Sequence, residues 1–133
     1  MDSQQLRALG FMTWQAFHPD HKRQLASCLP SCFGVYVIRR GTTVQRGRGM
    51  SDILYIGCAT YATGLRGRIS QYFSPGPTQS TNKRILALVR NSPDYYISWV
   101  ETETKGQAKS LEQDLLDRYI ADHGERPPEN LRG

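Results

Sequence analysis

The stretch from Gly34 to Phe73 reads GVYVIRRGTTVQRGRGMSDILYIGCATYATGLRGRISQYF and decides the fold. Apolar residues alternate along the chain from Gly34, and residues 53–59 repeat that alternation. Because a period of two is typical of strands, we expect two strands that pair as an antiparallel hairpin. The pairing can place Tyr36 and Tyr55 on one face, where Gly57 would leave open space beside a phenol.

The connection between these two strands, residues 42–52, carries Arg46 and Arg48 next to glycines. We expect a mobile and solvated loop here. Its arginines fit an exposed charged loop and a DNA contact equally well.

A helix is expected after the second strand. Its apolar positions have the spacing i, i+4, i+7 and i+8 of a helix with one buried face: Leu65, Ile69, Tyr72 and Phe73. Arg68 lies at one edge of this face and Arg66 borders the other edge. Periodicity alone therefore does not single out either arginine.

The rest of the chain adds a third strand and more helices. We expect short helices in residues 1–32, a helix from about Lys83 to Arg90, a strand from Tyr95 to Thr102 and a helix from Gly106 to about Asp122. A chain of 133 residues fits one domain. The sequence therefore predicts an α+β fold, with residues 33–133 as the domain and residues 1–32 as an N-terminal helical extension packed on it.

The net charge of +5 is unevenly distributed. Lysine and arginine gather between residues 39 and 90, where Asp52 is the single acid, whereas acids outnumber bases after residue 90. A clustered positive field fits a phosphate backbone and also an acidic protein partner. The candidates for contact with nucleic acid are Arg46, Arg48, Arg66, Arg68, Lys83 and Arg84.

The sequence has no apolar run long enough to cross a membrane, and its first residues lack the features of a signal peptide. We therefore expect a soluble, cytoplasmic protein with no membrane contact. Three cysteines are an odd set, so reduced thiols are expected.

Glu112 is out of place in the last helix. The apolar residues of this helix form one continuous arc, and Glu112 falls inside it, four residues after Ala108 and four before Leu116. A carboxylate in a core has a large desolvation cost unless it is paired, protonated or bound to a cation. Two interpretations stay open: a partly buried ion pair with an arginine, or a metal ligand or catalytic acid.

Taken together, these elements resemble the GIY-YIG nuclease superfamily. The matching residues are, in order, Gly34-Val35-Tyr36, Tyr55-Ile56-Gly57, Arg68, Glu112 and Asn130. The chain departs from the usual pattern in three ways. Val35 replaces the isoleucine of the first motif, the gap between the two motifs is longer than in many members, and Cys58 stands where repair-type members usually carry lysine.

The resemblance implies a small three-stranded antiparallel sheet flanked by helices, and metal-dependent hydrolysis of phosphodiester bonds in DNA. It implies that Glu112 holds one Mg²⁺ (or Mn²⁺) and selects Arg68 over Arg66 as the contact to the scissile phosphate. A tyrosine would take the proton from water, with Tyr55 as the first choice and Tyr36 as the second. Asn130 would be a structural or supporting hydrogen-bonding group.

Two other functions remain open at this point: a ribonuclease, and a catalytically idle module that binds nucleic acid. Since 133 residues leave no room for a separate DNA-reading domain, we expect targeting to come from loops, the N-terminal segment, a homodimer or a protein partner.

Overall fold

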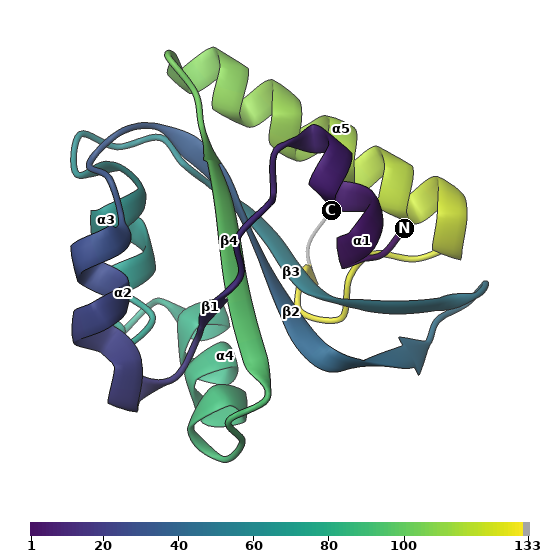
Figure 1. Ribbon diagram of the computed structural model, residues 1–133, viewed down its shortest axis with the longest axis horizontal. Coiled ribbons are helices and arrows are strands. Elements are labelled where there is room, and N and C mark those ends of the chain that lie inside the picture. Colours follow the sequence, from purple (N-terminus) through teal and green to yellow (C-terminus); the bar gives the residue numbers. More distant parts are fainter. Residues whose placement is uncertain (132–133) are drawn as a thin grey trace.

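Four antiparallel strands form the centre of the structure in the order β1–β4–β2–β3 (Figure 1). A computed structural model describes residues 1–131. The strands are β1 Gln15–Ala16, β2 Gly34–Gln45, β3 Met50–Ala59 and β4 Tyr95–Glu101. The α-helices are α1 Ser3–Leu6, α2 Lys22–Cys28, α3 Gly64–Ser70, α4 Ser80–Arg90 and α5 Lys105–His123, and two 3₁₀ turns, η1 Arg7–Leu9 and η2 Pro19–His21, precede α2.

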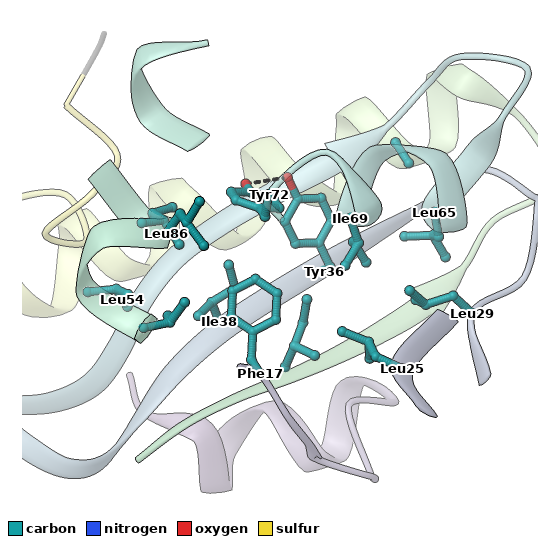
Figure 2. Packing of buried hydrophobic residues seen from close by; sticks show 14 residues of the cluster. Phe17, Leu25, Leu29, Tyr36, Ile38, Leu54, Leu65, Ile69, Tyr72 and Leu86 are labelled. Atoms are coloured by element: carbon teal, nitrogen blue, oxygen red, sulfur yellow. Dashed lines mark hydrogen bonds between the residues drawn. The ribbon is translucent and has the colours of Figure 1, made fainter. Parts of the chain in front are cut away.

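Helices cover both faces of the sheet, because successive side chains of a strand point to opposite sides. Tyr36 and Ile38 of β2 belong to a cluster that packs against α2, α3 and α4, part of which Figure 2 shows. Val35 and Val37 belong to a second cluster that packs against α1 and α5. The protein is thus an α+β fold with a helical layer on each side of one sheet.

The three strands expected from the sequence are present, and β1 adds a fourth. Gln15 and Ala16 pair with Ile97 and Tyr96 of β4, inside a segment for which only helices were expected. That segment also supplies Leu6 to one core cluster and Phe17 to the other. The prediction of a three-stranded sheet with a purely helical N-terminal segment is therefore corrected to four strands.

The hairpin of β2 and β3 is longer than the sequence indicated. The expected loop at residues 42–52 shrinks to the turn between Gln45 and Met50, because both strands continue past irregularities in pairing at Arg39. The register places Tyr36 opposite Gly57 and Tyr55 opposite Ile38. The two tyrosines share a face, as expected, but are diagonal neighbours with ring centroids 6.2 Å apart.

Gly57 makes room for the phenol of Tyr36. A Cβ atom at this position would lie 2.6 Å from both Cζ and the hydroxyl of Tyr36, and 2.7 Å from Cε2 of Tyr55. Distances this short are not tolerated in a packed interior, so a larger residue would displace one of the rings.

Helix α5 has clear start and stop signals. The Thr104 hydroxyl accepts a hydrogen bond from the backbone of Gln107, whose side chain accepts one from the Thr104 backbone in return, and Gly124 ends the helix with φ of 75°. These signals fix the position of Glu112 along the helix. Within residues 1–131, no helix is long and apolar enough to cross a membrane.

Candidate functional site

Three tyrosines gather on the face of the sheet that α3 covers. The hydroxyls of Tyr36 and Tyr72 are 2.8 Å apart, and this bond is drawn in Figure 2. The ring of Tyr55 lies 6.2 Å from that of Tyr36 and 6.5 Å from that of Tyr72. Helical spacing predicted Tyr72 only as a packing residue. The hydrogen bond of its hydroxyl was not predicted, because the partner, the hydroxyl of Tyr36, comes from a strand 36 residues away.

Arg68 joins this cluster, and Arg66 does not. The guanidinium carbon of Arg68 lies 5.0 Å from the ring centre of Tyr72 and 5.9 Å from that of Tyr36. Its Nη1 donates to Oδ1 of buried Asn82 at 3.2 Å. Arg66 instead donates through Nε to the backbone oxygen of Leu29 at 2.9 Å. The structure therefore separates the two arginines that periodicity left equivalent.

A cleft of about 270 Å³ opens beside the tyrosine cluster. Tyr55 of β3 and Glu112 of α5 both line it, although they come from distant parts of the chain. The rest of its lining comes mainly from α4, α5 and the C-terminal segment after α5: Thr81, Gln113, Leu116, Ile120, Arg126, Glu129, Asn130 and Leu131. Tyr36 is fully buried and does not line the cleft.

Glu112 is half-buried at the edge of the apolar face of α5. Burial raises the pKa of its carboxyl group, and the nearby groups Cys58, Arg68 and Lys109 oppose that rise. Among residues 1–131, every ion pair within 4.0 Å is formed by a carboxylate other than that of Glu112. The described residues therefore do not form the ion pair considered from the sequence, and Glu112 lines the cleft.

Cys58 follows the Tyr-Ile-Gly motif and is half-buried next to Glu112. Burial, followed by the charge of Glu112, raises the pKa of the Cys58 thiol to about 12. The thiol is therefore neutral at physiological pH. It adds no positive charge to the site where a lysine would have supplied one.

The tyrosines are protonated in this state of the protein. Burial raises the pKa of Tyr55, as does the charge of Glu112, whereas Arg68 and Tyr72 lower it. Burial raises the pKa of Tyr36 and of Tyr72 more strongly. Arg68 remains a cation: burial opposes its charge, but the neighbouring tyrosine oxygens outweigh burial and raise its pKa. Of the three phenols, Tyr55 is the one with both a cation beside it and access to the cleft.

Asn130 holds the C-terminal segment against the free edge of β3. Its Oδ1 accepts from the backbone N–H of Ile56 at 2.9 Å, and its Nδ2 donates to the Ile56 oxygen at 2.8 Å. The Glu129 N–H donates to the oxygen of Leu54 at 3.0 Å. Asn130 thus completes the strand edge as a neighbouring strand would, and it forms one wall of the cleft.

The other four basic candidates have protein partners. Arg46 bonds to the backbone oxygen of Arg126 at 2.8 Å and pairs with Glu125 at 3.1 Å. Arg48 donates to the oxygen of Ala121 at 2.7 Å. On α4, Lys83 donates to the oxygen of Pro77 at 2.9 Å, and Arg84 pairs with Glu129 at 3.0 Å. Their contact with nucleic acid stays a prediction, and for Arg46 it would compete with two existing contacts.

A larger cavity, of about 710 Å³, lies elsewhere, between the N-terminal segment and the β2–β3 hairpin. One of its two carboxylates, Asp52, accepts hydrogen bonds from the backbone and the hydroxyl of Ser3. One of its two guanidinium groups, Arg39, lies near the rings of Trp14 and Tyr96, 4.9 and 4.5 Å from their centres. None of the candidate site residues from the sequence lines this cavity.

The smaller cleft combines a carboxylate that makes no ion pair with residues 1–131, a phenol and, nearby, a half-buried guanidinium. Such a set suits the binding of a hydrated divalent cation and an anionic substrate. Comparison of the chain with protein-family models, curated proteins and solved structures gives no match.

Proposed function

We propose that this chain is a metal-dependent endonuclease of the GIY-YIG type that hydrolyses phosphodiester bonds in DNA. The observation that carries the proposal is that Glu112 and Tyr55, 57 residues apart in the sequence, line one cleft. Arg68, the third residue of the proposed set, lies close enough to Tyr55 to lower its pKa.

The proposal includes the finer fold assignment, a GIY-YIG-like sheet in which β2 and β3 carry the two tyrosine motifs. The antiparallel pairing of β2 with β3 and the room that Gly57 gives to Tyr36 support it. The additional strand β1 lies at the other end of the sheet, where it pairs with β4 and not with the motif-bearing strands.

The residues of the cleft fit a single Mg²⁺ or Mn²⁺ held through Glu112. Mg²⁺ keeps several waters and binds proteins through one or two carboxylates together with phosphate oxygens. Glu112 is free of ion pairs among the described residues, whereas the other carboxylate in the cleft, Glu129, is paired with Arg84. When bound, the ion would neutralise phosphate charge and lower the pKa of a coordinated water.

In this proposal the phenol of Tyr55 first releases its own proton to solvent, which the positive charge of Arg68 favours, and the phenolate then accepts the proton of the attacking water. Arg68 also stabilises the charge on the phosphate. A planar guanidinium can make two parallel hydrogen bonds to phosphate oxygens. Arg68 is suited to this because Asn82 and two aromatic rings fix its position before substrate binds. Tyr36 and Tyr72, which bond to each other, hold the phenol cluster in place.

A cleavage assay tests the proposal. Supercoiled plasmid DNA, labelled single- and double-stranded DNA, and the matching RNAs are incubated with the protein in Mg²⁺, Mn²⁺ or EDTA. We expect nicking of DNA that depends on the divalent ion. Faster cleavage of RNA would indicate a ribonuclease, and binding without cleavage in any metal would indicate an idle nucleic-acid-binding module. Cytoplasmic location and a homodimer or protein partner stay predictions.

A further inference from the structure

Arg126 is the cation of the cleft that neither the motifs nor the proposed mechanism uses. Its half-buried side chain lines the cleft together with Tyr55 and Glu112. Within residues 1–131, the side chain of Arg126 makes no ion pair and no hydrogen bond. Only its backbone oxygen accepts a hydrogen bond, from Arg46. A guanidinium presents five N–H donors, and none of the described residues supplies an acceptor for them.

The backbone of Arg126 is fixed on both sides. On one side, Arg46 donates to the Arg126 oxygen at 2.8 Å and pairs with Glu125 at 3.1 Å, and the N–H of Gly47 also donates to Glu125. On the other side, prolines 127 and 128 restrict the chain, and Asn130 binds the edge of β3. The turn of the β2–β3 hairpin therefore helps to fix the position of Arg126 at the cleft.

The charges around Arg126 leave it available to an anion. Glu129, three residues after Arg126, also lines the cleft, but its carboxylate is paired with Arg84 at 3.0 Å. Thr81 adds a hydroxyl to the same lining. Glu112 is the other carboxylate of the cleft, and it makes no ion pair within 4.0 Å among the described residues.

We propose that Arg126 forms a second phosphate-binding site in this cleft, which holds a backbone phosphate of the nucleic acid other than the one that Arg68 contacts. This inference rests on the proposed function, since it assumes that nucleic acid enters the cleft. Arg126 is a binding residue in this account and takes no part in proton transfer. A backbone contact gives affinity without reading sequence.

Binding and cleavage are measured separately. Affinity for a short fluorescein-labelled DNA duplex is followed by anisotropy at rising KCl concentrations, with Glu112→Gln as the background in which turnover is removed. We expect Arg126→Ala to raise the Kd about tenfold and to reduce the salt slope by about one. Arg126→Lys keeps the charge but loses the planar fork, so we expect the slope to return and the affinity to recover only in part.

Arg90→Ala is the matched control. Arg90 is exposed at the last turn of α4, about 14 Å along the helix axis from Thr81 at 1.5 Å per residue. Its replacement by alanine should therefore leave the Kd and the salt slope unchanged. Thermal unfolding of each variant reports on the fold, and Arg126→Gln takes the place of Arg126→Ala if the latter unfolds. A lower melting temperature with the Kd and slope unchanged would show a purely structural residue and overturn the proposal.

The outcomes separate this inference from the proposed function. If the protein cleaves DNA and Arg126→Ala binds it normally, Arg126 is not a phosphate contact while the nuclease stands. If the protein binds DNA but never cleaves it, and Arg126→Ala weakens that binding, the phosphate site stands and the nuclease fails. Absence of both binding and cleavage would overturn both.

Discussion

Access to the cleft distinguishes Tyr55 from Tyr36 as the base. Tyr55 is half-buried and lines the cleft, whereas Tyr36 is fully buried behind it. We expect Tyr55→Phe to lower the single-turnover cleavage rate by about a hundredfold or more, the usual contribution of a general base. Tyr36→Phe should have a smaller effect, through loss of its bond to Tyr72. A larger loss in Tyr36→Phe would reverse the assignment.

The buried phenols make the protein sensitive to alkali. Burial raises the pKa of Tyr36 above that of an unfolded tyrosine, so the folded chain keeps a proton that the unfolded chain releases. Stability is therefore unaffected below pH about 10 and falls above it, by about 1.4 kcal/mol per pH unit for each such group. Urea unfolding across this range should show a shallower fall in Tyr36→Phe, with the exposed Tyr61→Phe as control. Equal slopes in both variants would argue against this cause.

Residues with a local signal were predictable, and residues defined by distant partners were not. Tyr36, Tyr55 and Gly57 stand out through strand alternation, and Glu112 stands out as a carboxylate among apolar residues. Tyr72 and Arg126 look ordinary in the sequence. Their environments come from β2 and from the hairpin turn, which lie about 36 and 80 residues away.

At the scale of elements, the turn of the β2–β3 hairpin supports the cleft. Arg46 is held by two contacts to the segment after α5. We expect Arg46→Ala to lower the free energy of unfolding by about 1–2 kcal/mol, because the partly buried carbonyl of Arg126 loses a charged donor and a partly exposed ion pair is lost. Urea unfolding measures this effect, and Arg90→Ala should stay within about 0.5 kcal/mol of the parent.

A direct DNA contact by Arg46 gives a different result. Arg46→Ala would then weaken DNA binding without changing the free energy of unfolding. If Arg46 acts by holding Arg126 in place, Arg46→Ala should weaken DNA binding and also lower the free energy of unfolding, because Arg126 belongs to the segment that Arg46 holds.

The edge of β3 depends on Asn130. In Asn130→Ala both backbone groups of Ile56 lose their partners, and we expect a loss of about 1–3 kcal/mol in stability. Amide hydrogen exchange at Ile56 should become faster. Asn130→Asp keeps the acceptor for the Ile56 N–H, so it should retain more of the protection than Asn130→Ala does. Unchanged exchange in Asn130→Ala would show that the amide is protected by other contacts.

The long elements followed from the sequence, and the short or irregular ones did not. Helix α5 is long and has clear end signals, and strand β4 is rich in aromatic and β-branched residues, so their predicted bounds lie close to those in the structure. Strand β1 has two residues, too few for any periodicity, and it forms only because β4 offers a free edge. The continuation of β2 past Arg39 was hidden by the polar residues and glycines after it.

At the scale of the molecule, the cleft exists only when the whole chain is folded. Strand β3 supplies Tyr55, helix α5 supplies Glu112 and the following segment supplies Arg126 and Asn130, while helix α3 places Arg68 beside the tyrosine cluster. Sheet pairing and helix packing bring these parts together through contacts of large sequence separation. The sequence indicated Tyr55, Glu112 and Asn130 but not that the rest of the C-terminal segment, with Arg126, also lines the cleft.

The most direct test of the account is the cleavage of DNA by Glu112→Ala under single-turnover conditions in saturating Mg²⁺. We expect no Mg²⁺-dependent cleavage and an unchanged fold, because Glu112 is half-buried at the cleft and no ion pair among the described residues depends on it. Asp114→Ala, an exposed carboxylate two residues further along the same helix, should cleave at the parental rate. Full activity in Glu112→Ala would contradict the account.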